Sequence, residues 1–167
     1  MKKKGFTLIE LLIVIGIIAI LAAIIFVAVD PARRLAEARN AVRWSSTNSI
    51  LNAVLKYTVD NGGSLPTAIS GASVATNYII GTGGVGNCAA TCSNGGGTIS
   101  HSNDCLSLAA LVDEYIASIP IDPSGGTTWT AAQTGYYLSK STNGRITVGA
   151  CGTETVGGAQ PSISVSR

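Results

Sequence analysis

Residues 2–10 read KKKGFTLIE, and nineteen residues without a charge follow them. The apolar stretch that begins at residue 6 ends at residue 29 and is 24 residues long. As a helix it would span about 36 Å, enough to cross a hydrocarbon core of about 30 Å. Its length and its apolar character on every side exclude a buried core helix. The sequence therefore predicts a helix that crosses a membrane.

Glu10 lies five residues into this stretch. A carboxylate inside a membrane segment costs roughly 2.5–3.5 kcal/mol on insertion scales, so an acidic residue at this place is expected to have a function and a partner. The nearest cation that could reach it is the α-amino group created by cutting the chain between Gly5 and Phe6.

The basic head, the Gly5-Phe6 junction and Glu10 resemble the class III leader and N-terminal helix of type IV pilins and secretion pseudopilins. In that family a prepilin peptidase removes the leader on the cytoplasmic side and N-methylates the new N-terminal residue, here Phe6. The resemblance implies an assembly role for Glu10 and an inner-membrane assembly platform as a partner. It further implies a single-pass membrane protein, in contact with lipid, that later joins a homopolymeric extracellular filament at the cell surface.

Two simpler interpretations of the head compete with this one. A secretory signal has an apolar region of 7–15 residues and a small-x-small cleavage site, whereas this apolar stretch is longer and has no Ala-x-Ala before Asp30. A plain membrane anchor would need neither the Gly5-Phe6 junction nor Glu10. Basic residues occur on both sides of the segment and leave its orientation open. The resemblance and the cysteines place the C-terminal side outside.

The predicted fold class is α+β and pilin-like. A long N-terminal helix, with its first half in the membrane, would pack on a small globular head that contains a short antiparallel sheet. The expected parts are the leader, the transmembrane and filament-core helix, the amphipathic second half of the helix and the extracellular head, at residues 1–5, 6–30, 31–61 and 62–167.

Helix-forming residues continue after Pro31 until an Asn-Gly-Gly sequence at residues 61–63 stops them. An apolar stripe with helical spacing predicts the face that meets the head. Its residues are Leu51, Val54, Leu55 and Thr58, preceded by a weaker stripe at Leu35, Ala38 and Val42.

The head is predicted to begin with a surface loop at residues 64–103, which includes a short strand at residues 78–80. A second helix is expected to begin at Asp104, which can cap it, and to end at Pro120. The Pro-x-Asp-Pro run at residues 120–123 and the aromatic-rich strand after it also resemble the C-terminal half of major pseudopilins.

A hairpin is predicted from the apolar runs at residues 136–138 and 146–148. A three-residue loop with Gly144 in the left-handed conformation pairs the apolar faces. This register places Leu138 opposite Val148 and Tyr136 opposite Ala150. The tail at residues 162–166 alternates in polarity and could add an edge strand.

All four cysteines lie beyond the apolar segment, which indicates disulfides in an oxidising compartment. Three pairings are possible, and the sequence alone does not choose among them. The pairing favoured is Cys88–Cys92 with Cys105–Cys151. A zinc site is the alternative, but a site of four cysteines usually shows two close pairs, and only one is present here.

The sequence predicts neither enzyme activity nor a cofactor. His101, the single histidine, lies beside serines and is interpreted as a solvated loop residue. The Gly-rich run at residues 81–86 has the spacing of a dinucleotide fingerprint, but no helix-forming sequence follows it. Major pseudopilins bind calcium in a C-terminal loop, and this region offers only Asp122 and, distantly, Glu154 as ligands.

Charge argues against nucleic acid as a partner. The net charge of +2 includes Lys2, Lys3 and Lys4, and without these three residues it becomes −1. The mature chain would therefore have no basic excess with which to neutralise phosphates. The predicted function is a structural subunit of a type IV pilus-like filament. The alternatives are a major pseudopilin of a type II-like secretion system and a membrane-anchored binding domain that does not polymerise.

Overall fold

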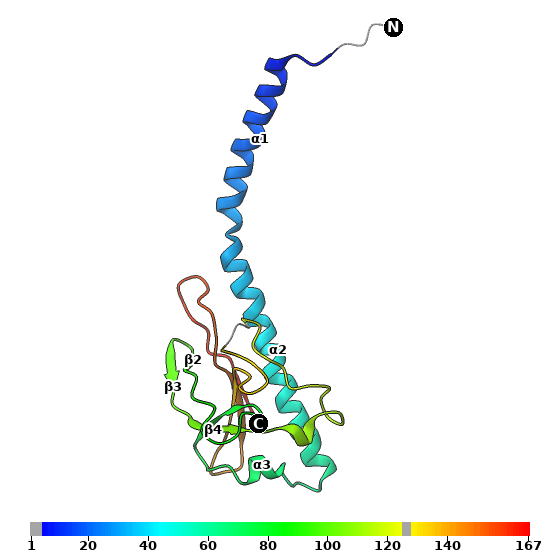
Figure 1. The fold of residues 1–167 in the computed structure, drawn as a ribbon, viewed down its shortest axis with the longest axis vertical. Helices are drawn as coiled ribbons and strands as arrows, with labels where there is room; N and C mark the ends of the chain where they lie inside the picture. Colours follow the sequence, from blue (N-terminus) through cyan, green and yellow to red (C-terminus); the bar gives the residue numbers. More distant parts are fainter. Residues whose placement is uncertain (1–4, 125–127) are drawn as a thin grey trace. The chain divides into compact units, whose positions relative to one another are not determined.

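The computed structural model describes residues 5–124 and 128–167. The fold is α+β, as predicted: a long N-terminal helix is followed by a small head with a mixed sheet and a short antiparallel sheet (Figure 1). The chain divides into two compact units between Leu35 and Ala36. Each unit has its own internal structure.

The first unit is dominated by helix α1, Leu8–Val29, none of whose residues is buried. By length and composition, the helical region that begins at Leu8 is the one candidate for crossing a membrane among the described residues. Helix α1 ends at Val29, and its C-cap residue Asp30 has a φ of +42°. Helix α2, Pro31–Asp60, begins at the next residue. The break has a local cause, because the residue before a proline is disfavoured in helical geometry.

The second unit contains most of α2, the short helices α3 (Thr67–Ser70) and η1 (Ala109–Leu111), and the strands. The larger sheet has the strand order β4-β1-β5-β6-β7, in which β4 and β1 are parallel and the other pairs are antiparallel. The smaller sheet pairs β2 with β3. The bounds of β1 to β7 are Asn77–Ile80, Cys92–Asn94, Gly97–Ile99, Ser102–Leu106, Tyr136–Lys140, Ile146–Ala150 and Ser164–Ser166.

The head core forms where the later turns of α2 pack against the larger sheet. Ile50, Leu51 and Val54 of α2 are buried in one cluster with Leu138 of β5 and Val148 of β6. Leu51 and Val54 belong to the predicted apolar stripe, and both face the core as expected. Each fully buried aliphatic side chain of this kind contributes about 1.5–3 kcal/mol relative to an exposed one.

The earlier, weaker stripe was a wrong prediction, because Leu35 and Val42 are 57% and 49% exposed. The buried face of this part of α2 is largely polar and comprises Ala36, Asn40, Arg43, Ser46 and Thr47. The spacing of apolar residues could not reveal this face, because most of its members are polar.

The hairpin was predicted correctly. Tyr136 pairs with Ala150 and Leu138 with Val148, and Gly144 has a φ of +78° in the connecting turn. The expected strand near residues 78–80 is β1, and the tail supplies the edge strand β7 beside β6. These features depend on turn chemistry and on alternation within a few residues, which the sequence shows directly.

The helix predicted to begin at Asp104 does not form. Residues 102–106 are the strand β4, and only the 3-10 turn η1 follows before residue 120. Parallel pairing with β1 and the disulfide of Cys105 hold β4 extended, and Asp113 adopts a φ of +73°, which interrupts any helix beyond η1. The predicted loop at residues 64–103 also contains more structure than expected, namely α3, β2 and β3.

Candidate functional site

The start of α1 contains the residues for which roles in processing and assembly are predicted. Gly5, Phe6 and Thr7 precede the helix and are exposed. Thr7 is the N-cap, with extended backbone angles of φ −82° and ψ 153°, and Glu10 lies in the first turn. The Gly5–Phe6 bond therefore lies in non-helical backbone just before α1.

Thr7 and Glu10 form a reciprocal capping box. The Glu10 amide donates to Thr7 Oγ1 over 3.3 Å. In return, the Thr7 amide and hydroxyl donate to Glu10 Oε2 over 2.8 and 2.7 Å. The T-x-x-E spacing is a sequence signal for this arrangement, although the capping box was not among the predictions. The Glu10 carboxylate thus has two donors within its own chain.

A buried charge network in the head was also missed. The Arg43 side chain is fully buried, with Nε 2.7 Å from Asp122 Oδ2 and Nη2 2.8 Å from Asp122 Oδ1. Nη2 also lies 3.0 Å from Glu154 Oε1, and Nη1 donates to Asn40 Oδ1 over 2.9 Å. The guanidinium thereby joins α2 to the Asp122 loop and to the loop that follows β6.

The rest of the network completes the hydrogen bonding of these groups. Asn40 Nδ2 donates to the Glu154 carbonyl over 2.8 Å, and the Glu154 amide donates to Asn40 Oδ1 over 3.0 Å. Arg39 Nη1 lies 3.0 Å from Glu154 Oε2 at the exposed margin of the network. Burial by itself lowers the pKa of Arg43, but its bonds to Asp122 and Glu154 outweigh that effect and raise the pKa. The group therefore remains a cation.

The same network bears on the calcium alternative. Both Asp122 oxygens contact Arg43, and Oδ1 also accepts from the Ser124 amide over 2.9 Å. Asp122 and Glu154 do converge, as a calcium site in this region would require, but the cation between them is a guanidinium. Among the described residues, no group of three or more histidine, cysteine or acidic side chains is arranged to hold a metal ion.

The cysteines form two disulfides, Cys88–Cys105 and Cys92–Cys151. The favoured pairing, Cys88–Cys92 with Cys105–Cys151, was therefore wrong, and with all four thiols oxidised the zinc alternative has no ligands. The reason lies in the fold. Strand β4 runs parallel to β1 and brings Cys105 to Cys88, whereas β2 lies beside the end of β6 and brings Cys92 to Cys151.

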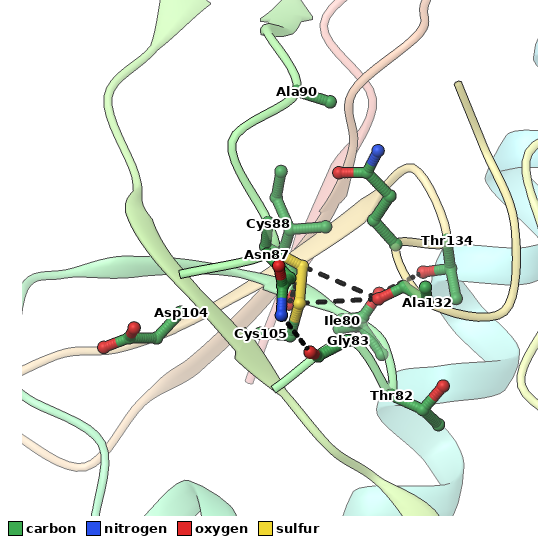
Figure 2. The surroundings of a disulfide bond; sticks show 12 residues. Ile80, Thr82, Gly83, Asn87, Cys88, Ala90, Asp104, Cys105, Ala132 and Thr134 are labelled. Carbon is green, nitrogen blue, oxygen red and sulfur yellow. Dashed lines mark hydrogen bonds between the residues drawn. A yellow bond between two sulfur atoms is a disulfide. The ribbon is translucent and has the colours of Figure 1, made fainter. Parts of the chain in front are cut away.

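Backbone hydrogen bonds secure the first of these disulfides. The Cys88 amide donates to the Asn103 carbonyl over 2.8 Å, and the Cys105 amide donates to the Gly84 carbonyl over 3.0 Å. Figure 2 shows both sulfur atoms beside the Ala132 carbonyl oxygen, at 3.7 Å for Cys88 and 3.4 Å for Cys105. The disulfide therefore ties the Gly-rich loop to β4 and to the segment that precedes β5.

Disulfide mapping of the full-length chain is expected to show the two pairings of the structure. Proteolysis without reduction should give one peptide pair linked through Cys88 and Cys105 and another linked through Cys92 and Cys151, because those sulfur atoms are the ones that the sheets bring together. Mass spectrometry identifies both pairs, and a reduced sample is the control. A dominant Cys88–Cys92 species would contradict the strand arrangement.

Two further predictions, one on a residue and one on a segment, can be compared with the structure. His101 lies outside the helices and strands, as expected, but it is only partly exposed, with Nδ1 2.8 Å from the Ser102 carbonyl oxygen and Nε2 3.0 Å from the Ala90 carbonyl oxygen. No helix follows directly after the Gly-rich run at residues 81–86, so a dinucleotide fingerprint lacks its helix N-terminus here.

Comparison with known proteins bears on the N-terminal segment. Residues 1–26 match the family model of the prokaryotic N-terminal methylation motif, which corresponds to a class III prepilin leader. Together with the long apolar helix, this match is consistent with a type IV pilin-like protein. No curated protein and no solved structure matches the chain. The motif suggests a membrane-anchored structural subunit, not an enzyme.

Proposed function

We propose that the chain is the structural subunit of an extracellular type IV pilus-like filament. The observation that carries this proposal is the methylation motif at residues 1–26, which overlaps a helix whose whole surface is apolar apart from Glu10. A surface of this kind is costly in water, so it requires either lipid or neighbouring copies of the same helix around it.

The proposed pathway has three stages, and each uses a different part of the chain. The lysines of the leader at residues 1–5 stay on the cytoplasmic side while residues 6–30 span the membrane. A prepilin peptidase then cuts between Gly5 and Phe6 and methylates the new amine of Phe6. An inner-membrane assembly platform moves the processed subunit into the filament, where residues 6–30 form the core and the disulfide-bonded head faces outward.

Glu10 is proposed to set the stagger between subunits. Phe6 precedes α1 in the same chain and, if the helix continued to it, would lie about 6 Å from Glu10 along the axis. Among the described residues, the Thr7 amide and hydroxyl, and no cation, meet the Glu10 carboxylate. A neighbouring subunit that is displaced along the axis by about that distance could place its own Phe6 ammonium beside Glu10. The resulting ion pair would compensate the carboxylate in an apolar core, where an unpaired charge is strongly unfavourable.

A major pseudopilin of a type II-like secretion system is the second candidate. The Pro-x-Asp-Pro run favours it by resemblance, and Asp122 within this run is buried and links the loop to α2 through Arg43. The two disulfides and the long segment between β1 and β5 favour a surface-displayed pilin instead. Neighbouring genes for a secretin, a platform protein and a retraction motor would separate a pilus from a secretion system. A membrane-anchored domain that does not polymerise would leave Glu10 and the Gly5-Phe6 junction without a role.

Processing is the first test of the proposal. Intact mass analysis of the mature protein is expected to show a chain that begins at Phe6 and carries one methyl group on its amine. Gly5→Val should leave the uncut precursor in the membrane, because the added side chain occupies the peptidase position that glycine leaves open. Mature filaments whose subunits retain Met1 would contradict the proposal.

A further inference from the structure

The residue that decides where α1 begins is Thr7. Its Oγ1 accepts from the Glu10 amide over 3.3 Å, and its carbonyl accepts the helical bond from the Leu11 amide over 3.3 Å. Its own φ and ψ are extended, so the backbone leaves the helix at this residue. Gly5 and Phe6 consequently lie outside the helix, and Phe6 is 85% exposed.

We propose that Thr7 is a positioning residue for leader cleavage, which keeps the Gly5–Phe6 bond in extended, accessible backbone. The inference rests on the proposed processing of the leader and adds a residue that the resemblance did not assign. Peptidases act on backbone whose amides and carbonyls are free to meet the enzyme. If α1 began one turn earlier, the carbonyls of Gly5 and Phe6 would instead accept hydrogen bonds from amides within the helix.

Thr7 is held in this conformation from both sides. Its amide and hydroxyl donate to Glu10 Oε2, while its hydroxyl oxygen accepts from the Glu10 amide. The reciprocal bonds satisfy two backbone donors at the helix start and two of the acceptor positions of the carboxylate. The side chain of Thr7 therefore has a structural task that valine cannot perform, since valine has the same shape but no hydroxyl.

The reaction itself is an ordinary hydrolysis. Water adds to the Gly5 carbonyl carbon, the bond from that carbon to the Phe6 nitrogen breaks, and Gly5 leaves as a carboxylate. The Phe6 nitrogen takes up protons and becomes an ammonium group. Thr7 does not touch the reacting atoms. It changes the fraction of precursor molecules in which the bond is available, and the apparent affinity of an enzyme for its substrate falls with that fraction.

The test measures initial cleavage rates of full-length precursors by a prepilin peptidase in mixed detergent and lipid micelles, at several precursor concentrations. Thr7→Val is expected to raise KM by up to about five-fold and leave kcat unchanged, because the loss of an N-cap changes the underlying equilibrium constant by about that factor. Thr7→Ser retains the hydroxyl and should restore a KM within about two-fold of the wild type. The matched control is Thr142→Val, the same chemical change at an exposed turn residue of the head.

Four other results of this experiment would contradict either the role of Thr7 or the proposed function. Thr7→Val with the KM of the wild type would overturn the role of Thr7 while leaving leader processing intact. A lower kcat at unchanged KM would show that the peptidase contacts Thr7 directly. A Thr7→Ser variant as slow as Thr7→Val would show that the peptidase requires the methyl group of Thr7. Either result would overturn the inference. A wild-type chain that is never cut at Gly5–Phe6 would overturn the proposed function itself.

Discussion

Glu10→Ala is expected to abolish assembly into filaments while leaving membrane insertion and leader cleavage intact. Insertion should be no worse, because alanine removes a carboxylate that costs roughly 2.5–3.5 kcal/mol in a membrane segment. Cleavage should still occur, because the hydrogen bond to Thr7 Oγ1 comes from the backbone amide of residue 10 and persists in the variant. The loss of the two bonds that Thr7 donates to Glu10 Oε2 should raise KM less than Thr7→Val does.

Assembly should fail for an electrostatic reason. In the filament core the Phe6 ammonium of an incoming subunit would have no carboxylate to meet, and an unpaired charge in such an environment is costly. The apolar side chains of α1 would still associate, but apolar contact is non-directional and does not select one stagger over another. The register between subunits would therefore be lost.

Filament number and length on intact cells provide the measurement, by microscopy of sheared surface material and immunoblotting of each fraction. Glu10→Asp is the matched control, since it retains the charge on a shorter side chain and should give a milder defect. Filaments of normal number and length from Glu10→Ala cells would show that the proposed ion pair has no role in assembly.

Arg43→Met is expected to destabilise the head by about 3–5 kcal/mol, the usual cost of removing one partner from a buried ion pair. Arg43 and Asp122 both have side chains with no exposed surface. Methionine would fill much of the volume but would leave the Asp122 carboxylate buried without its cation. For a unit of this size the loss corresponds to a fall in Tm of roughly 10–20 °C.

Arg39→Met is the matched control within the same network. Its pair with Glu154 lies at the margin, with side chains 42% and 26% exposed. Such a pair is worth about 0–1 kcal/mol because solvent screens it. Thermal unfolding of the full-length chain in detergent, with both disulfides intact, measures both variants. Equal falls in Tm for Arg39→Met and Arg43→Met would contradict the prediction that the buried Arg43 stabilises the head more than the exposed Arg39 does.

A double-mutant cycle isolates the pair itself. Asp122→Asn alone should be strongly destabilising, because it leaves the buried Arg43 cation poorly compensated. In the Arg43→Met background the same change should cost less, since the carboxylate that it removes no longer has a cation. Additive losses of stability would show that the two side chains do not act as one unit.

The sequence alone predicts the structure of some parts of the chain much better than that of others. The apolar helix, the end of α2 at Asp60 and the hairpin around Gly144 were all predicted from residues close together in the sequence. The break at Asp30-Pro31 is equally local, although one long helix was predicted. The capping box of Thr7 and Glu10 is equally local and was open to prediction from its spacing. Backbone stereochemistry and periodic burial act over a few residues, so the sequence by itself determines these features.

Only the tertiary structure decided the features that join distant segments. Residues 104–119 have helical spacing of apolar side chains, yet pairing of β4 with β1 keeps their first part extended. The same strand arrangement determines which of the three possible ways of pairing the four cysteines occurs, namely Cys88–Cys105 with Cys92–Cys151. Arg43 and Asp122 are 79 residues apart and meet because the folded head brings α2 to the Asp122 loop. Such contacts require the chain to close loops over long separations, which costs conformational entropy. Only the packing of the whole head offsets this cost, so a pattern of neighbouring residues cannot predict the contacts.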